Sequence, residues 1–517
     1  MRKFDVVIYG ATLAGISAAY WLGRQGFSIC VLEPSPYIGG AIAGGLSWQD
    51  FPPDNLASQI LAGRVTGDFF RENAMAAYRR PLTDYTDRGL EPKTSARLLR
   101  DMLHQSNAFV KTGVRLEKGD VIIEKGRITA VQTADGPVSG DFWIGASYEG
   151  DLGHHAGITY TSGRESETVY GENRAGFRPE FAYKLPGFSG LGALVPPCPD
   201  LVAGAGDRRL QSFTFRVTVT GNAANRLPFP RPAGYDRNSP HLQLLAQMIA
   251  LKNYRYIADI VSGDALPDDK YDLNSMAIVG CDCVGLNNGY AESGWAARDA
   301  MVAAHLLQVQ SVLYYIQNDT DVPHLKADAR RWGLCRDEFP GSPYGDGFTP
   351  TLYIREARRL VGATVLTQRD QETEASGGTP TKATRCTSWS YGFRDKHGVQ
   401  YYVDPDDPET LCMEGNLKRS TDVDYVGVQN PPAAYDIPFE ALMPRPGQIG
   451  NFAEAVCFSC SSIFWASARM EPNFGNLGIA CAALAKHCLG RRCSTADYDY
   501  ATVRADMRDH MRVANSA

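Results

Sequence analysis

The sequence has no long hydrophobic run. No stretch reaches the roughly 18 uncharged apolar residues that a membrane-spanning helix needs, so we expect no membrane partner. A signal peptide would show an apolar block of about 7–15 residues followed by a small-residue cleavage site. The N-terminus instead runs directly into a strand pattern at residues 4–9, which a glycine motif follows. We therefore expect a cytoplasmic protein.

The chain also lacks an excess of positive charge. Its 52 basic and 58 acidic side chains give a formal net charge of −6, which argues against a general nucleic-acid partner. It has twelve cysteines, but the close pairs Cys281/Cys283 and Cys457/Cys460 have no second Cys/His pair at zinc-ligand spacing nearby. We therefore expect no metal. The length of 517 residues, with no internal repeat, predicts two or three hydrophobic cores.

The strongest local motif is a glycine-bearing turn between a strand and a helix. Residues 4–9 and 27–33 have the pattern of buried strands, and residues 12–25 have that of a helix, which together make a βαβ unit. In a dinucleotide-binding turn the first glycine permits the tight turn and the last lets helix and strand pack closely. Here a threonine replaces the middle glycine, and its hydroxyl is able to bond a phosphate oxygen. The residues assigned to this turn are Gly10, Thr12, Ala14 and Gly15.

An acidic residue ends the second strand of this unit. Glu33 follows Gly15 by 18 residues and is placed to accept hydrogen bonds from a ribose hydroxyl, which disfavours the 2′-phosphate of NADP. A glycine-rich loop comes next at residues 39–48, and a β-meander pattern spans residues 108–131. Both features are typical of FAD proteins of the glutathione-reductase class. We expect Gly39, Gly40, Gly45 and Val114 to contact the cofactor.

The whole chain resembles the FAD-dependent oxidoreductase family whose fingerprint reads G-x-T-x-x-G. The resemblance is carried by four further segments in family order, at residues 146–166, 352–370, 435–445 and 468–485. It implies an α/β fold with a Rossmann-like FAD-binding domain of glutathione-reductase type and an inserted α+β substrate domain. It also implies that the flavin lies beside the last segment and that Asp151 contacts the cofactor. The residues implied beside the flavin are Arg469, Glu471, Gly475 and Gly478.

The order of the segments predicts a discontinuous FAD-binding domain. We expect it to comprise residues 1–165 and 435–495, with the substrate domain at 166–434 and a C-terminal helix or tail at 496–517. Two positions depart from the family pattern. Gly145 stands where the family often has aspartate, and Ser462 stands where it tends to have histidine. If the family uses that histidine as a general acid or base, this protein either lacks such a group or has another residue in the role.

Several residues are candidates for catalysis. His154 and His155 have the right chemistry for a general base but could equally face solvent as adjacent loop residues. Tyr148 lies just before them, and Arg355 could grip a substrate carboxylate or be a solvated helical arginine. Cys457 could form a redox dithiol with Cys460, although apolar flanks favour inert buried thiols. Arg469 could instead form a structural ion pair.

These features together predict a FAD-dependent oxidoreductase. We expect hydride transfer between flavin N5 and a small organic substrate that offers an alcohol, an amine or a C–C bond. The glycine-rich stretches at 190–196 and 202–208 lack a following helix and acid, so the second redox partner is expected to be an external acceptor or donor. An oligomer is compatible with the sequence. The alternatives are a flavin-dependent monooxygenase and, from another class, a structural flavoprotein subunit without turnover.

Overall fold

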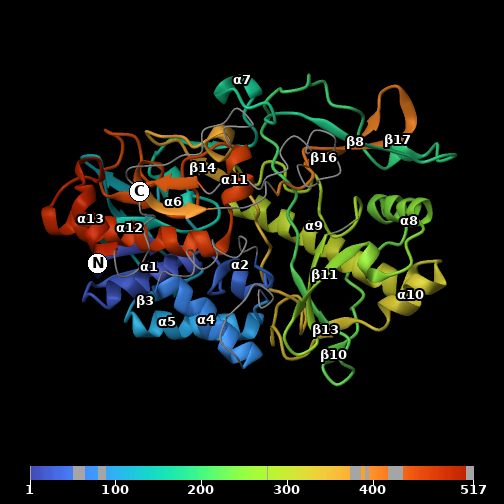
Figure 1. Cartoon of the computed structure of the whole chain (residues 1–517), viewed down its shortest axis with the longest axis horizontal. Helices are drawn as coiled ribbons and strands as arrows, with labels where there is room; N and C mark the ends of the chain where they lie inside the picture. Colours follow the sequence, from blue (N-terminus) through green and yellow to red (C-terminus); the bar gives the residue numbers. More distant parts are fainter. Residues whose placement is uncertain are drawn as a thin grey trace.

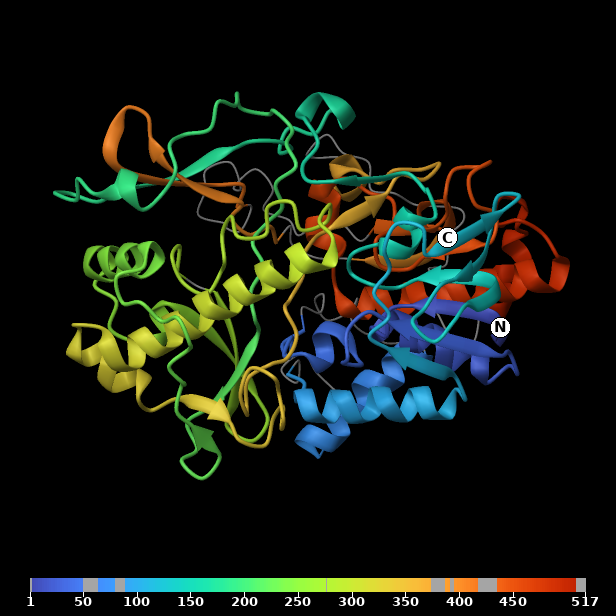
Figure 2. The same ribbon diagram turned by 180° about the vertical axis from the view of Figure 1, so that it is seen from behind.

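A computed structural model describes residues 2–49, 64–79, 89–275, 277–372, 386–390, 395–416 and 435–507. The molecule has two halves that lie side by side (Figure 1). One half is built on a seven-stranded sheet and the other on a five-stranded antiparallel sheet with helices of its own. From behind, helix α9 (Trp295–Tyr314) is seen to run from the second half up to the junction (Figure 2).

The seven-stranded sheet combines parallel and antiparallel strands. Its order is β3-β2-β1-β6-β5-β4, with β19 beside the C-terminal part of β6. Strands β1, β2, β3, β6 and β19 pair in parallel, and β4, β5 and β6 pair antiparallel. Strand β2 is buried along its whole length, as expected for a parallel strand that is covered on both faces. The strands are β1 Arg2–Tyr9, β2 Ile29–Glu33, β3 Phe109–Thr112, β4 Val121–Glu124, β5 Arg127–Val131, β6 Val138–Gly145 and β19 Phe452–Glu454.

Two long helices from opposite ends of the chain pack against each other on this sheet. Helix α1 (Leu13–Gly23) contacts α12 (Glu471–Arg491) on one side and α5 (Pro92–Gln105) on the other. Both α1 and α12 are buried over most of their length, because small side chains let the helices approach closely. The remaining helices of this half are α2 Gly40–Ala43, α4 Arg64–Tyr78, α6 Asp151–His155, α11 Ser462–Ala468 and α13 Tyr500–Met507.

The second half has its own hydrophobic core. Its antiparallel sheet has the order β10-β13-β9-β12-β11, and a three-stranded sheet has the order β16-β17-β8. Two two-stranded sheets, β7 with β14 and β15 with β18, belong to the first half, since Tyr160, Leu360, Tyr435 and Ile437 pack in its hydrophobic clusters. The bounds of the strands are β7 Tyr160–Ser162, β8 Pro179–Lys184, β9 Val217–Thr220, β10 Arg226–Leu227, β11 Val261–Leu266, β12 Lys270–Ser275, β13 Gly333–Cys335, β14 Arg358–Leu360, β15 Cys386–Ser390, β16 Gln400–Asp404, β17 Asp407–Glu414 and β18 Tyr435–Pro438. The helices are α7 Glu167–Tyr170, α8 Pro240–Lys252, α9 and α10 Pro323–Ala329.

The α/β class and the N-terminal βαβ unit are confirmed. The meander expected at 108–131 is partly wrong, because β3 pairs in parallel with β2 and only β4, β5 and β6 run antiparallel in succession. The last long helix begins at Glu471, within the segment 468–485 that carries the family resemblance. Of the C-terminal helix or tail expected at 496–517, the part after Met507 lies outside the described residues.

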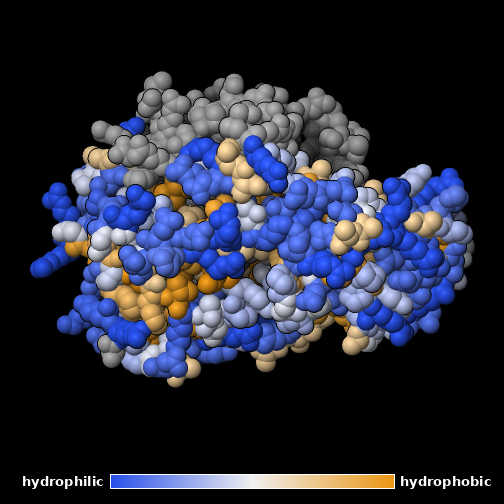
Figure 3. Space-filling model, turned by 90° about the horizontal axis from the view of Figure 1, so that it is seen from below, coloured by the Kyte–Doolittle hydropathy of each residue, from blue (hydrophilic) through white to orange (hydrophobic). Residues whose placement is uncertain are grey.

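The face of the molecule seen from below is mainly hydrophilic (Figure 3). Seen from below (Figure 3), hydrophobic side chains gather in one area on the half that holds the seven-stranded sheet. Among the helices of the described ranges, none is long and apolar enough to cross a membrane.

Candidate functional site

The turn between β1 and α1 requires its glycines. Gly10 has a φ of +114°, and a Cβ there would lie 2.4 Å from the carbonyl carbon of Ala146, on β6's continuation. A Cβ on Gly15 would lie 2.0 Å from the Gly10 carbonyl oxygen. The first-turn amides of α1 have no carbonyl one turn back, so they are donors that suit a phosphate. This is the geometry that a dinucleotide's pyrophosphate needs.

Thr12 has a different task from the one expected of its hydroxyl. Its Oγ1 donates to the Ala146 carbonyl at 2.8 Å and accepts from the Gly15 amide at 3.4 Å as the N-cap of α1. The hydroxyl is thus engaged within the protein and is not directed at a phosphate. Any contact of Thr12 with the cofactor would come from its backbone amide.

Glu33 lies at the end of β2 with its carboxylate buried beneath the turn. Oε2 accepts from the Ala11 amide at 2.7 Å and Oε1 from the Ser35 amide at 2.9 Å. Burial raises the pKa of Glu33 to about 7. Each oxygen keeps lone-pair capacity for a hydroxyl donor such as a ribose. The amide of Val114, a residue expected at the same site, donates to the Glu33 carbonyl, and the Val114 carbonyl accepts from Tyr9 Oη. The part of Val114 that can contact a cofactor is therefore its side chain.

The Gly39–Gly40 pair lies directly over the start of α1. Both glycines have positive φ, and a Cβ on Gly40 would lie 2.5 Å from Tyr148 Oη and 3.2 Å from Thr12 Cα. Gly45, further along the loop, instead packs against the second half, where its Cβ would lie 2.2 Å from the Arg216 carbonyl oxygen. The loop therefore connects the nucleotide turn to the other half of the molecule.

Tyr148 joins this loop to the start of α12. Its hydroxyl accepts from the Ala41 amide at 2.9 Å and donates to Glu471 Oε1 at 2.5 Å. Burial raises the pKa of Glu471 to about 7 and that of Tyr148 well above its ordinary value. The second carboxyl oxygen of Glu471, Oε2, is buried and has no hydrogen-bond partner among the described residues. A bound molecule with an N–H or O–H donor would satisfy it.

The two glycines of α12 serve close helix packing. A Cβ on Gly478 would lie 2.1 Å from the Ala14 carbonyl oxygen of α1, and one on Gly475 would lie 2.9 Å from Thr66 of α4. These contacts fix the N-terminus of α12 relative to the N-terminus of α1. Ala14, assigned to the cofactor site, thus also forms the helix-helix contact.

Arg469 precedes α12 and forms an ion pair with Asp395, not with Glu471, which lies two residues away in the sequence. Its Nη2 lies 2.9 Å from Asp395 Oδ2, and its Nη1 donates to Tyr353 Oη at 2.7 Å. Glu471 bonds Tyr148 instead. The guanidinium therefore links the α12 terminus to Asp395 from the segment before β16.

The two departures from the family pattern are filled by other side chains. A Cβ on Gly145 would lie 2.4–2.9 Å from the carboxyl group of Glu454, so Glu454 occupies the space that an aspartate side chain would take there. At the second position, Ser462 Oγ accepts from Lys396 Nζ at 2.7 Å and donates to Glu356 Oε1 at 2.7 Å. Titratable side chains thus lie at both places, although they come from elsewhere in the chain.

The other candidates of the sequence lie in less favourable surroundings. His154 is exposed and His155 half-buried on the short helix α6. Asp151 is held by Arg298, with contacts of 2.7 and 2.9 Å, and by Arg358 at 2.6 Å, which favours a structural role at the junction. Burial raises the pKa of both Cys457 and Cys460 well above the ordinary value, which favours inert thiols over a redox pair.

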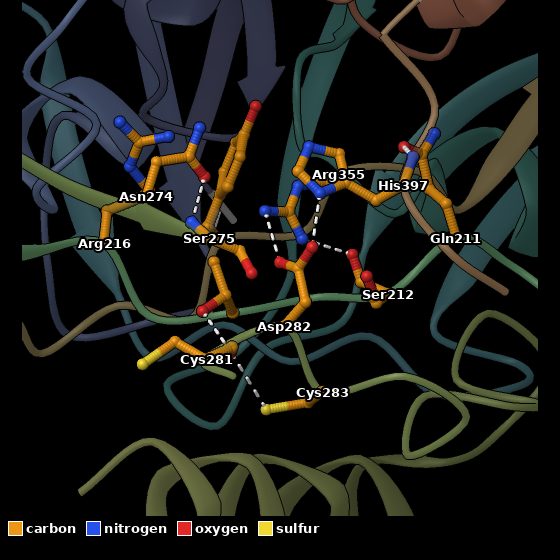
Figure 4. Close-up of polar contacts among 12 residues, drawn as sticks. Gln211, Ser212, Arg216, Asn274, Ser275, Cys281, Asp282, Cys283, Arg355 and His397 are labelled. Atoms are coloured by element: carbon orange, nitrogen blue, oxygen red, sulfur yellow. Dashed lines mark hydrogen bonds and ion pairs between the residues drawn. The ribbon is translucent and has the colours of Figure 1, made fainter. Parts of the chain in front are cut away.

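Arg355 belongs to a buried polar cluster that the sequence did not reveal (Figure 4). Its Nη2 lies 2.9 Å from Asp282 Oδ1, and Asp282 Oδ2 lies 2.5 Å from His397 Nδ1. His397 Nε2 in turn lies 3.4 Å from Oδ2 of Asp395, the partner of Arg469. Asp282 and His397 carry no sequence motif, and their separation of 115 residues hides the pair. Arg355, Asp282, His397 and Asp395 are together called the His397 cluster.

One acidic group resembles a metal site but already holds a cation. Carboxyl oxygens of Glu91, Asp337 and Glu338 lie within 4.8 Å of one another. Lys270 Nζ bonds all three, at 2.7, 2.8 and 2.6 Å respectively. The ammonium group thus occupies the place between the carboxylates that a metal ion would take.

The family model for FAD-dependent oxidoreductases matches residues 5–507 of this sequence. The chain belongs to the FAD-dependent oxidoreductase family. FAD is its cofactor. The turn at Gly10, the Glu33 carboxyl group and the first-turn amides of α1 offer acceptors and donors that would suit it. The orphaned oxygen of Glu471 also fits a ligand that carries hydrogen-bond donors.

More distant likenesses cover small parts of the oxidoreductase. The NADP(+)-dependent formate dehydrogenase subunit beta of Moorella thermoacetica is 40% identical over 62 residues, which is 12% of this chain and 9% of that protein. A geranylgeranyl bacteriochlorophyll reductase-like protein from Thermoplasma acidophilum is 18% identical, with 31% of this chain and 43% of that chain covered and a TM-score of 0.22. L-proline dehydrogenase from P. horikoshii is 14% identical, with 32% and 59% covered and a TM-score of 0.24.

Proposed function

We propose that the oxidoreductase transfers a hydride between a small organic substrate and flavin N5. The half with the seven-stranded sheet, residues 1–165 and 435–495, holds FAD in a glutathione-reductase-type arrangement, and residues 166–434 supply the substrate side. The single observation that carries this proposal is the chain of contacts from the Gly40 loop through Tyr148 to Glu471 at the start of α12. It brings the N-terminus of a second helix close to the nucleotide turn.

Within this proposal the turn residues hold the dinucleotide. The amides at the start of α1 donate to the pyrophosphate, and Glu33 accepts from the ribose of the adenosine part. FAD supplies the hydride acceptor or donor at N5 when it is bound. The N-terminus of α12 carries a partial positive charge that favours negative charge on an adjacent ring. Arg469 adds a full charge there, moderated by Asp395.

The substrate side is proposed to include the His397 cluster. Its charged and polar groups come from the second half and reach the α12 terminus through Asp395 and Arg469. The buried Nε of Arg355 makes no hydrogen bond to the described residues, so it is a donor open to a substrate oxygen. This arrangement can orient a polar substrate.

The test is a cofactor and reduction assay on purified protein. We expect about one FAD per chain, identified as FAD and not FMN after heat release, because Glu33 has a ribose to hold only in the dinucleotide. Anaerobic titration with a panel of alcohols and amines should bleach the flavin absorbance with at least one compound class. A flavin that dithionite reduces but that no organic compound reduces, and that forms an oxygen adduct after reduction, would favour a monooxygenase instead. A flavin that exchanges electrons with nothing would favour a structural subunit.

A further inference from the structure

Two cysteines lie side by side where helix α12 ends. The helix stops at Arg491, and Arg492 follows in the left-handed region with a φ of +54°. The Cys493 amide then donates to the Cys488 carbonyl at 3.1 Å. The left-handed residue and this hydrogen bond are those of a Schellman motif, in which the residue after the chain reversal packs on the last turns of the helix. Cys493 is thereby turned back over Cys488.

The two thiol groups interact directly. Burial raises the pKa of the Cys488 thiol, and the adjacent Cys493 thiol raises it further. A disulfide needs Cα atoms about 4.4–6.8 Å apart. The hydrogen bond between the backbones of the same two residues holds their Cα atoms near this separation. The pair can therefore be joined without a rearrangement of the helix end.

The two cysteines differ in exposure. Cys488 is buried, whereas Cys493 is partly exposed and packs at the edge of the hydrophobic core of the first half. In the pairs that are closer in sequence, both cysteines are buried. These pairs are Cys281/Cys283 and Cys457/Cys460. The end of α12 thus combines a thiol that a small solute can reach with a second thiol behind it.

We propose that Cys493 and Cys488 form a reversible disulfide on exposure to hydrogen peroxide, and that the disulfide holds the following segment on α12. The Cys493 thiolate attacks one peroxide oxygen, the O–O bond breaks and hydroxide leaves, so Cys493 becomes a sulfenic acid. The Cys488 sulfur then attacks the Cys493 sulfur, the S–O bond breaks, and water leaves as the S–S bond forms. In total, two thiols and one peroxide give one disulfide and two waters. A dithiol reductant reverses the reaction by exchange.

The exposures set the order of the two steps. Cys493 meets the peroxide first because Cys488 is covered. The raised pKa of Cys488 leaves it a small thiolate fraction, but its contact with Cys493 gives it a high effective concentration for the second step. Cys488 lies about 25 Å from Glu471 along α12, by the rise of an α-helix. The flavin site proposed at that end is too far away to exchange a hydride with these thiols.

The segment after Cys493 returns to the body of the protein. The Thr495 amide donates to the Gly450 carbonyl at 2.9 Å, and the Asp499 amide donates to His487 Nε2 at 3.1 Å. Helix α13 follows and packs on α12. A disulfide at Cys493 closes a ring around the helix end, which limits local opening of this segment. Oxidation should therefore slow amide hydrogen exchange in residues 494–499.

Peptide mapping of the purified, flavin-loaded full-length protein tests the proposal. The protein is treated with hydrogen peroxide, free thiols are blocked with iodoacetamide, and trypsin is added. Trypsin cuts at the two arginines between Cys488 and Cys493, which leaves these cysteines in separate peptides, 487–491 and 493–504. We expect the two peptides to be linked after peroxide and to separate with dithiothreitol. The flavin absorbance should not change.

Two variants separate a disulfide from ordinary surface oxidation. In Cys488→Ser the linked species should be lost, and the sulfenic acid of Cys493 should accumulate as an adduct with dimedone. Cys198→Ser removes the other partly exposed cysteine of the described residues, whose thiol donates to the Pro199 carbonyl at 3.6 Å, and it should form the link like the parent.

The parent protein alone decides the outcome, even if Cys488→Ser does not fold. A Cys488 that iodoacetamide still blocks completely in denatured protein after peroxide treatment overturns the proposal. Equal dimedone labelling of Cys493 in the parent and in Cys488→Ser does the same, because it shows that Cys488 does not react with the sulfenic acid. Equal hydrogen exchange of residues 494–499 in the reduced and linked forms overturns the role of the disulfide in holding this segment.

Discussion

Substituting Gly478 tests whether the contact between α12 and α1 builds the cofactor site. A Cβ at this position would lie 2.1 Å from the Ala14 carbonyl oxygen and 2.8 Å from its carbon. These atoms are backbone atoms of a buried helix, so no side chain can move aside to make room. Gly490 lies on the same helix, is exposed, and has nothing within 4 Å of its Cβ position, which makes it the matched control.

The expected magnitude follows from these distances. A comfortable contact between carbon and a carbonyl oxygen is about 3.3 Å, so Gly478→Ala must separate the two helices locally by about 1 Å. Overpacking of this kind typically costs about 1–3 kcal/mol, partly offset by up to about 1 kcal/mol of better helix propensity. We expect a net loss of about 1–2 kcal/mol in unfolding free energy. Gly490→Ala should gain about 0.5–1 kcal/mol, since it receives the propensity gain without the clash.

The assay combines urea unfolding of the apoprotein with FAD affinity. Gly478→Ala should weaken FAD binding by roughly tenfold for each 1.4 kcal/mol, because the clash moves the N-terminus of α12 away from that of α1. Gly490→Ala should bind FAD like the parent protein. If Gly478→Ala is as stable as the parent and retains FAD equally well, then the close approach of the two helices is not what shapes the site, and the reasoning fails.

Three further predictions concern other parts of the site. Gly10→Ala should abolish FAD retention, as read from the ratio of flavin to protein absorbance, whereas Gly26→Ala, also at positive φ but with open space around it, should retain FAD. Burial raises the pKa of Glu454 to about 7, above its ordinary value, so the stability that this proton adds is present below about pH 4.5 and is lost as the pH rises through 7. Glu454→Gln should therefore flatten the pH dependence of apoprotein unfolding by up to about 3 kcal/mol between pH 5 and 8, and an unchanged slope would contradict the assignment. Arg469→Ala should lower the flavin's two-electron potential by about 30 mV, equivalent to about 1.4 kcal/mol, while Asp395→Asn should raise it, and equal shifts of one sign would refute an electrostatic role.

The sequence predicts the N-terminal unit well because its determinants are local. The strand, the turn at Gly10, the helix and Glu33 lie within about thirty residues, and each has its own pattern. The prediction for the Thr12 hydroxyl was wrong because its partner is not local. Its hydroxyl reaches the Ala146 carbonyl, 134 residues away, and no pattern around Thr12 shows that this acceptor is beside it. Side-chain direction at a turn is decided by the strand that pairs next to it.

The His397 cluster could not be predicted from the sequence at all. Asp282, Arg355 and His397 come from three separate segments, and only the fold brings them within hydrogen-bonding distance. A lone histidine before a strand carries no signal, because burial and charge partners determine its chemistry and both are tertiary properties. His154 and His155 attract more notice in the sequence because they are adjacent, although adjacency says nothing of the burial and charge partners that determine a histidine's chemistry.

The departures from the family pattern require the same three-dimensional view. In the sequence, position 145 lacks the carboxylate of the family pattern, and position 462 lacks its titratable ring. In space, Glu454 places its carboxyl group where a side chain at position 145 would lie, and Lys396 bonds the Ser462 hydroxyl. Since an added side chain at 145 would collide with Glu454, the two positions must change together, and Gly145→Asp alone should place two carboxylates in one buried space. The chemistry of a site is thus preserved by volume and charge, and the residue that supplies them can come from elsewhere in the chain.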